Sequence, residues 1–154
     1  NLSISRGECV LICGESGSGK TTITRLINGL IPHYYEGELT GDISVLDMDI
    51  KKSELCKIAK HVGSVFQNPR SQFFCVDTTS ELAFGCENMG LPEDEIRKRV
   101  QSVADEMNIN HLLGRSIFDL SGGEKQRISI ARAMLKDFGP FARYICFRRA
   151  NIKP

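Results

Sequence analysis

The chain has 154 residues, 41% of them hydrophobic and 25% charged, with a formal net charge of +1. This composition is ordinary for one globular domain, and the near-zero charge gives no indication of a nucleic acid or an acidic substrate as partner. No segment has the length and apolarity that predict a membrane span or a signal peptide, so we expect any membrane role to act through a partner protein. The six cysteines include no CxxC pair, which favours a reducing, cytoplasmic setting over disulfide or metal roles.

The chain opens with a pattern that predicts a strand, a glycine-rich turn and a helix. Residues 8–13 form a short apolar run, which we expect to be a buried strand with Cys9 and Cys13 acting as small apolar residues. The turn spans 14–19, and Pro32 is expected to end the helix that follows. Apolar residues recur at helical spacing in that helix at Ile23, Leu26, Ile27 and Leu30.

Two further regions predict strands. Turn residues and alternating apolar positions, Ile43 and Val45 among them, indicate short strands within 37–50. Residues 62–66 also have the composition of a strand, and it would end just before Gln67.

The remainder of the chain is expected to be mainly helical. Thr78 and Glu81 have the spacing of a capping box, so helices are expected over 78–112. A second run, 124–136, follows a pair of glycines that would present free backbone N–H groups. Apolar residues share one face of these helices at Ile96, Val100, Val103 and Met107, and then at Ile128, Ala131 and Leu135.

A phosphate-binding loop is the first functional motif. Residues 14–21 match the pattern G-x-x-x-x-G-K-[ST] in full, and the strand and helix on either side are the context in which this motif works. Glycines let the backbone N–H groups point at phosphate oxygens, Lys20 would reach the β- and γ-phosphates, and the Thr21 hydroxyl would hold Mg²⁺. By itself this loop does not distinguish kinases, GTPases, helicases and transport ATPases. The candidate nucleotide-binding residues are Gly14, Glu15, Ser16, Gly17, Ser18, Gly19, Lys20, Thr21 and Thr22.

A second motif, Leu120-Ser-Gly-Gly-Glu-Lys-Gln-Arg127, narrows the class. Glycines behind a serine at a helix N-terminus make another anion-binding surface, which suggests contact with a nucleotide held by another subunit. With both motifs in this order, the chain resembles the ATP-binding-cassette (ABC) ATPases. Their signature sequence is LSGGQ or a close variant, and Glu124 stands here at the fifth position.

The resemblance implies an α/β fold: an incomplete P-loop NTPase core of the RecA-like type, residues 1–76 and 117–136, with a helical subdomain at 77–116. It implies that Gln67 is the Q-loop residue, contacting Mg²⁺ and the attacking water and lying next to the membrane subunit. The cofactors would be ATP and Mg²⁺, and ATP would join a second ATPase subunit head to tail. The chain would then lie at the cytoplasmic face of a membrane, bound to transmembrane transporter subunits. The residues that would grip the partner's γ-phosphate are Ser121, Gly122, Gly123 and Glu124.

A narrower resemblance joins residues 28–33, 35–39 and 67–73 to the ATPase subunits of energy-coupling-factor importers. Those proteins take up vitamins or transition-metal ions, so the resemblance implies a small solute of that kind. His33 has no partner ligands nearby in the sequence, and we interpret it as a loop residue and not a metal ligand.

The sequence departs from the family after Leu135. A hydrophobic strand ending in Asp-Glu is expected there, followed further on by a histidine, but the only acidic residue after Leu135 is Asp137. The family's first strands, with an aromatic residue that stacks on adenine, would precede Asn1. We therefore expect weak or absent ATP hydrolysis by the chain as it stands. The alternatives are a non-catalytic, ATP-binding or dimerising subunit, and an ABC ATPase outside transport; the compact spacing of the motifs disfavours the latter.

Residues 137–154 form an atypical tail, and a frameshift is one hypothesis for its origin. One permitted choice of codons for 142–154, read one base out of frame, encodes QDIYVLDEPTSNLD when T or C follows the stop codon; this supplies the Asp-Glu strand. The competing interpretation is a basic segment for an anionic partner. The charged residues of this segment interleave with apolar residues, in a pattern that predicts neither a helix nor a strand. The basic residues are Arg143, Arg148, Arg149 and Lys153.

Overall fold

The computed structural model describes residues 2–5, 7–66, 68–135 and 144–149. The chain forms two compact units, residues 1–62 with 138–154, and residues 63–137, and each is described by itself.

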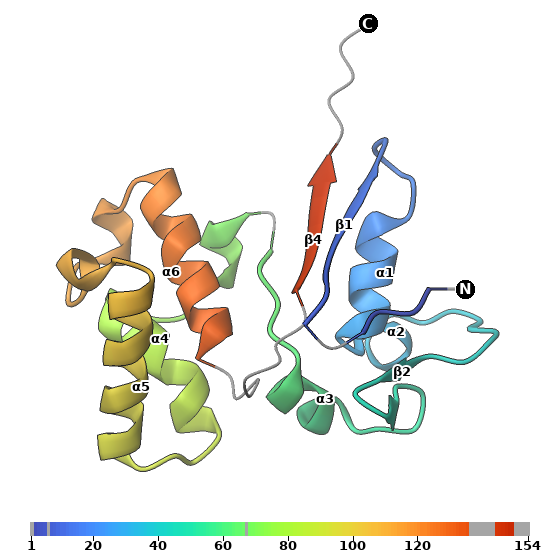
Figure 1. Ribbon diagram of the computed structural model, residues 1–154, viewed down its shortest axis with the longest axis horizontal. Coiled ribbons are helices and arrows are strands. Elements are labelled where there is room, and N and C mark those ends of the chain that lie inside the picture. The colour runs from blue at the N-terminus through green and yellow to red at the C-terminus, as the bar shows by residue number, and fades with distance from the viewer. Residues whose placement is uncertain (1, 6, 67, 136–143, 150–154) are drawn as a thin grey trace, which may run out of the picture. The chain divides into compact units, whose positions relative to one another are not determined.

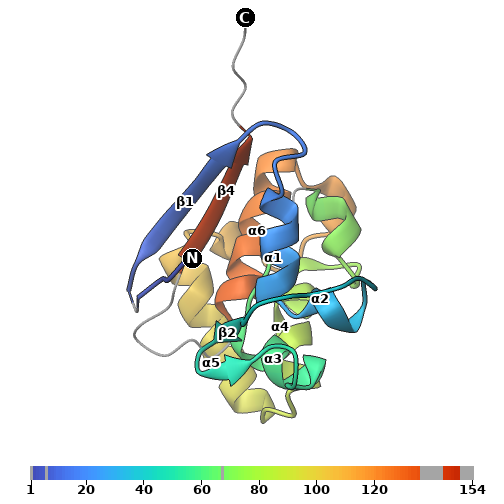
Figure 2. The same ribbon diagram turned by 90° about the vertical axis from the view of Figure 1, so that its right-hand side faces the viewer.

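The first unit contains a strand–loop–helix segment and a small hairpin (Figures 1 and 2). The strand β1 runs parallel to β4, in a register that places Cys9 opposite Tyr144 and Gly14 opposite Arg149. The hairpin strands β2 and β3 are antiparallel, which confirms the short strands expected within 37–50. The elements of this unit are β1 (Cys9–Gly14), α1 (Lys20–Ile27), α2 (Leu30–His33), β2 (Ser44–Val45), β3 (Met48–Asp49), α3 (Leu55–His61) and β4 (Tyr144–Arg149).

Strand β1 is confirmed, but the expectation that it is buried throughout is wrong. Its side chains alternate between exposed and partly covered, and Leu11 is 57% exposed. Cys9 and Cys13 lie on the exposed side with it. This alternation is the pattern of a strand covered on one face only, and α1 packs against it.

Helix α1 ends earlier than Pro32. It stops at Ile27, and Gly29 then adopts a φ of +76° that an L side chain rarely accepts. A Cβ at Gly29 would lie 2.7 Å from Cδ1 of Ile58 on α3, so the absence of a side chain also permits this close approach. The short helix α2 follows, and His33 at its end is bonded through Nε2 to the carbonyl oxygen of Ile50, 2.9 Å away.

Part of the tail is a strand, which the sequence pattern did not predict. Residues 144–149 pair with β1 along its whole length. Four consecutive residues, Tyr144 to Phe147, favour strands and are consistent with this. The arginines on either side of them broke the apolar pattern from which a strand would have been predicted.

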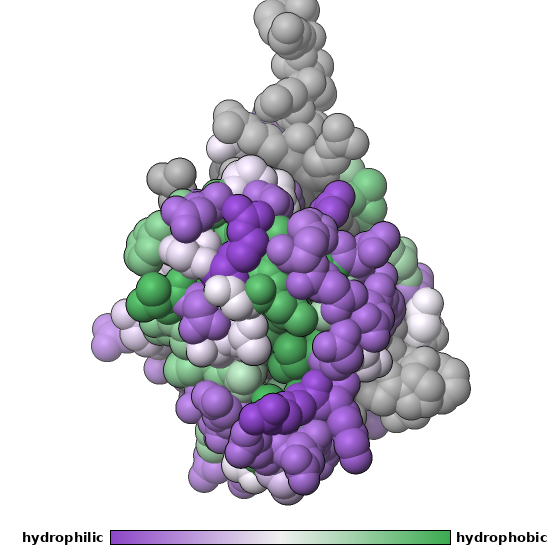
Figure 3. Space-filling view, turned by 90° about the vertical axis from the view of Figure 1, so that its left-hand side faces the viewer, coloured by the Kyte–Doolittle hydropathy of each residue, from purple (hydrophilic) through white to green (hydrophobic). Residues whose placement is uncertain are grey.

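The second unit is a helical assembly around one apolar core. Its elements are η1 (Pro69–Gln72), α4 (Thr78–Asn88), α5 (Glu93–Glu106), η2 (Asn110–Leu112), η3 (Ile117–Asp119) and α6 (Gly122–Met134). The side of Figure 1 on which α4 and α5 lie presents a central apolar area with hydrophilic side chains around it (Figure 3). The apolar faces expected from the sequence are confirmed, since the core consists of Leu82, Cys86, Ile96, Val100, Val103, Ala104, Ile109, Leu112, Leu120, Ile128, Ala131 and Leu135, with Met107 packed against it.

The capping box expected for Thr78 and Glu81 is wrong. The N-cap of α4 is Asp77, whose carboxylate accepts a hydrogen bond of 2.9 Å from the amide of Ser80. The Thr78 hydroxyl donates to the carbonyl oxygen of Leu112, and Glu81 binds groups outside its own helix. The sequence spacing placed the start of the helix correctly to within one residue. The side chains of Thr78 and Glu81, however, bond to Leu112 and Arg132 and not to the helix N-terminus.

The strand expected at 62–66 is also absent from the described residues. Ser64 and Phe66 lie in an irregular segment, and their backbone groups bond to the side chain of Gln72. A side-chain amide here satisfies the backbone groups that a neighbouring strand would otherwise pair with.

Candidate functional site

The phosphate loop connects β1 to α1 in the first unit, as the sequence predicted. Gly17 and Gly19 have φ angles of +87° and +85°, which lie in the left-handed region that glycine tolerates. At Gly14 a Cβ would lie 2.7 Å from Oγ of Ser18, so the loop closes tightly across its own start. The glycines of the motif therefore set the curvature that a phosphate-binding loop requires.

The ammonium of Lys20 lies against the inside of this loop. Its Nζ donates to the carbonyl oxygens of Gly14 at 2.8 Å and Glu15 at 2.5 Å, and to Oγ of Ser18 at 2.9 Å. The Ser18 hydroxyl in turn donates to the Glu15 carbonyl oxygen at 2.9 Å. One positive charge is thus held where the loop bends around it, and phosphate oxygens could replace these neutral acceptors and form stronger, charge-assisted bonds.

The N-terminus of α1 adds backbone donors to the same place. Its N-cap is Gly19, and no side chain caps the helix. The first N–H groups of a helix have no intrahelical acceptor, and the helix dipole adds positive potential there. Thr21 in this first turn has an exposed side chain. The donor set, one ammonium with several backbone N–H groups and a hydroxyl, fits a magnesium-bound polyphosphate.

The signature motif lies in the second unit, at the start of α6. Gly122 and Gly123 form the first turn of the helix and do not precede it, which refines the sequence expectation. Ser121 is the N-cap: its Oγ accepts from the Glu124 amide at 3.3 Å, and its own amide donates to Oε2 of Glu124 at 2.7 Å. This reciprocal capping box fixes where the helix begins and leaves the amides of the two glycines without intrahelical acceptors.

The Glu124 carboxylate has its pKa lowered below the ordinary 4.5, chiefly because it accepts hydrogen bonds from Ser121. The guanidinium of Arg115, 3.6 Å from Oε1, adds to the effect. The N-terminus of α6 therefore carries a negatively charged carboxylate, and the positive charge of Arg115 offsets part of it.

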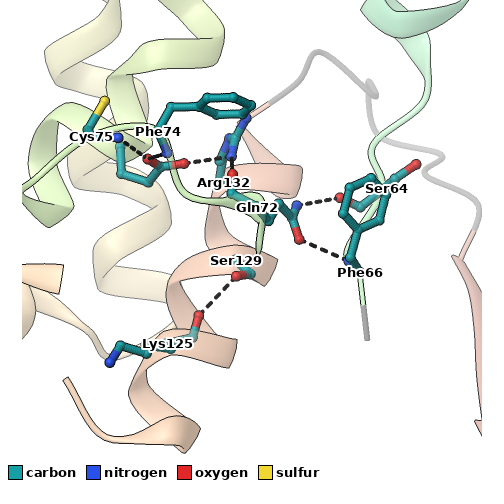
Figure 4. A network of polar contacts seen from close by, with 9 residues as sticks. Ser64, Phe66, Gln72, Phe74, Cys75, Lys125, Ser129 and Arg132 are labelled. Carbon is teal, nitrogen blue, oxygen red and sulfur yellow. Dashed lines mark hydrogen bonds and ion pairs between the residues drawn. The ribbon is translucent and has the colours of Figure 1, made fainter. Parts of the chain in front are cut away.

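The catalytic candidate Gln67 lies outside the described residues. The segment before it, Ser64 to Phe66, is held by Gln72, and Gln72 is bonded in turn to Arg132 of α6 (Figure 4). Gln72 lies in the segment 67–73 that resembles energy-coupling-factor ATPases, but the sequence predicted no role for it or for Arg132, because a single polar residue in a loop or on a helix gives no signal until its partner is known. Of the expected site residues, the structure gathers Gly14 to Thr22 in one unit and Ser121 to Glu124 in the other.

Comparison with known proteins decides the family. The model of the ABC transporter family matches residues 1–138, almost the whole chain. The chain belongs to the ABC transporter family. This confirms the enzyme class expected from the two motifs, an ABC-type ATPase by family, and the match ends where the atypical tail begins.

Curated relatives in the ABC transporter family agree with this assignment. An ABC transporter ATP-binding protein of Treponema denticola is 52% identical over 131 residues, which are 85% of this chain and 27% of that protein. Another from Sulfurisphaera tokodaii is 42% identical over 135 residues, 88% of this chain and 29% of that protein. The chain therefore spans little more than a quarter of these relatives' length.

A solved structure confirms the fold class. The structure of cbiO1 from Clostridium perfringens, described as part of the ABC transporter complex cbiONQ, is 35% identical with a TM-score of 0.78. The match covers 89% of this chain and 53% of that one. The chain thus has part of the P-loop NTPase fold of ABC ATPases. None of the helices that the structure describes has the length and apolarity to cross a membrane.

Proposed function

We propose that this chain is the ATP-binding part of an ABC importer, and that it couples ATP to the transport of a small solute by a membrane partner. The observation that carries the proposal is the position of Lys20, whose ammonium lies inside a glycine loop at the N-terminus of α1. Because the chain belongs to the ABC transporter family, we propose ATP as the nucleotide. The loop supplies hydrogen-bond donors for its phosphates.

In this proposal Lys20 and the backbone N–H groups of residues 14–22 bind the β- and γ-phosphates. The Thr21 hydroxyl holds Mg²⁺, and Gln67 contacts the same ion and orients the attacking water. The geometry of the loop supports the first of these roles, since Lys20 already lies within hydrogen-bond distance of Gly14 and Ser18. The others rest on the positions of these residues in the motifs.

The signature motif is proposed to act on a second ATPase subunit, identical or similar to this one. Ser121, Gly122, Gly123 and Glu124 would contact the γ-phosphate bound to the partner's loop, because free amides at the start of α6 favour an anion. ATP would then join two such chains head to tail.

The importer and its solute are proposed on two grounds. The chain resembles cbiO1, which is described as part of the transporter complex cbiONQ, and its own segments 28–33 and 67–73 resemble energy-coupling-factor ATPases. We propose a vitamin or a metal ion as the solute. We also propose a peripheral position on the cytoplasmic side of the membrane, bound to transmembrane subunits.

A second candidate function, ATP binding without turnover, is favoured by the sequence after Leu135. It contains Asp137 but no Asp-Glu pair, and the family match ends at residue 138. Without these carboxylates Mg²⁺ binding is weaker and the glutamate that would polarise the water is missing, so hydrolysis by this chain is expected to be very slow. The frameshift is proposed as the cause. Sequencing the DNA that encodes residues 130–154 tests it: the shifted frame must encode the Asp-Glu strand and stay open.

Thermal unfolding with and without Mg-ATP tests nucleotide binding. A ligand that binds only the folded state raises the melting temperature, and saturation at one hundred times the Kd stabilises by about 2.7 kcal/mol. Lys20→Met should abolish the rise. Lys60→Met, which changes an exposed lysine of α3 in the same unit, should preserve it. An unchanged melting temperature of the parent chain at millimolar Mg-ATP would refute the proposal.

A further inference from the structure

We propose that Gln72 is a positioning residue that fixes the backbone leading into Gln67, and that Arg132 ties this contact to the signature helix α6. The inference rests on the proposed function of Gln67 as a ligand of Mg²⁺ and water. All the contacts that carry it lie within the second unit, residues 63–137.

The side-chain amide of Gln72 holds the irregular segment at two points (Figure 4). Its Oε1 accepts from the amide of Phe66 at 2.9 Å, and its Nε2 donates to the carbonyl oxygen of Ser64 at 2.8 Å. Gln72 is 8% exposed, so neither bond is readily exchanged for water. Only a side chain with both a donor and an acceptor at this length can make the pair of contacts.

Phe66 immediately precedes Gln67 in the chain, so these two bonds restrict the backbone at the point where the candidate catalytic residue begins. Phe66 and Val65 are themselves 47% and 39% exposed, so their side chains are only partly held by packing. The two hydrogen bonds to Gln72 therefore restrain the backbone of a segment whose side chains are not fully buried.

Gln72 is in turn fixed from α6 and α4. Nη1 of Arg132 donates to the backbone carbonyl oxygen of Gln72 at 2.6 Å and to Oε1 of Glu81, also at 2.6 Å. The other carboxylate oxygen of Glu81 accepts from the amides of Phe74 at 2.8 Å and Cys75 at 2.9 Å. One buried carboxylate thus orders the chain just after Gln72, while one guanidinium orders Gln72 itself.

This arrangement links, through one unit, the signature motif that would contact the partner's ATP and the residue Gln67 that would contact the Mg²⁺ of this chain's own ATP. Helix α6 begins at the signature glycines and carries Arg132 near its other end, and Arg132 leads through Gln72 to Phe66. A shift of α6 on binding a partner's phosphate would therefore act directly on the backbone before Gln67. That makes Gln72 a specific determinant of magnesium-dependent ATP binding, in addition to any effect on stability.

Residue-resolved hydrogen exchange tests the contact itself without nucleotide. Gln72→Met keeps the side-chain length but removes the donor and the acceptor, and we expect the Phe66 amide to exchange roughly tenfold faster or more. Gln101→Met is the matched control, because the side chain of this exposed glutamine of α5 bonds to Asp105 and Asn110, away from Phe66 in the sequence and within the same unit. It should leave Phe66 unchanged. If the Met variant does not fold, Gln72→Asn serves instead, since its shorter amide cannot span both partners.

The functional readout is the ratio of ATP affinities measured with Mg²⁺ and with a chelator. We expect Gln72→Met to lower this ratio severalfold while leaving magnesium-free ATP binding unchanged, which a general loss of stability would not do. Unchanged exchange at Phe66, or an unchanged ratio in a variant with faster exchange, would overturn the inference. Absence of ATP binding by the parent chain would refute the proposed function instead, and the exchange experiment would still decide whether Gln72 holds Phe66.

Discussion

Arg132 and Glu81 form an ion pair that joins α6 to α4, with 2.6 Å between Nη1 and Oε1. The Glu81 side chain is fully buried, and its second oxygen accepts from two backbone amides. Buried charges of this kind are tolerated only when each finds partners. Both carboxylate oxygens of Glu81 have partners in this network, so we expect the contact to be highly sensitive to mutation.

Glu81→Ala is predicted to lower the free energy of unfolding by about 3–4 kcal/mol, because it leaves the largely buried guanidinium of Arg132 without its counter-charge and two amides without their acceptor. Urea unfolding monitored by circular dichroism measures this value. Glu93→Ala is the control, since the side chains of its ion pair with Arg97 on α5 are 78% and 76% exposed and the pair should contribute almost nothing. Equal effects of the two substitutions would contradict the account of this network.

The capping box of α6 predicts a specific pH dependence. Bonds from Ser121 hold the pKa of Glu124 below 4.5, with a smaller contribution from Arg115. Because the folded-state pKa is lowered, the stabilisation is present above about pH 4.5 and is lost as the pH falls through the lowered pKa. The difference in stability between the parent and Glu124→Gln should therefore shrink toward low pH.

An NMR titration of the Glu124 carboxyl group checks the cause directly. Ser121→Ala removes the largest contribution, so the pKa should rise toward 4.5. Ser116→Ala is the matched control, since Ser116 caps η3 instead and should leave the Glu124 titration unchanged. A pKa in the parent at or above 4.5 would refute the interpretation.

Gly29 is predicted to be intolerant of a side chain. Its φ of +76° is unfavourable for alanine, and the added Cβ would lie 2.7 Å from Cδ1 of Ile58 and 3.2 Å from Cδ1 of Leu55. Strain and overpacking together should lower the free energy of unfolding by about 2–4 kcal/mol. Gly37→Ala, at a position with neither a positive φ nor a neighbour within 4 Å, should be close to neutral. Chemical denaturation of both variants measures the difference, and similar stabilities would contradict the prediction.

The sequence predicted the parts of the fold whose signals are local. The strand, loop and helix around Lys20 follow from an apolar run, glycines and helical periodicity, and the structure has all of them. The apolar face of α5 followed from the spacing of Ile96, Val100 and Val103 for the same reason. The candidate roles of Thr21 and Gln67 stay predictions.

The errors arose where a side-chain partner outside the segment overrode a local pattern. Residues 62–66 read as a strand, but Gln72 satisfies their backbone groups through its side chain. Glu81 had the spacing of a capping residue, but Arg132, 51 positions later, takes its carboxylate. Spacing along the chain cannot reveal contacts of that kind, because they depend on which helices pack together.

The most direct test of the account is equilibrium binding of radiolabelled Mg-ATP to the purified chain, followed by analysis of the bound nucleotide. The account predicts saturable binding that Lys20→Met abolishes and Lys60→Met preserves, with the bound nucleotide recovered as ATP. Failure to bind at millimolar Mg-ATP would contradict the assignment of the phosphate loop. Repeated release of phosphate, dependent on Lys20, would contradict the expected loss of hydrolysis and exclude the second candidate function, ATP binding without turnover.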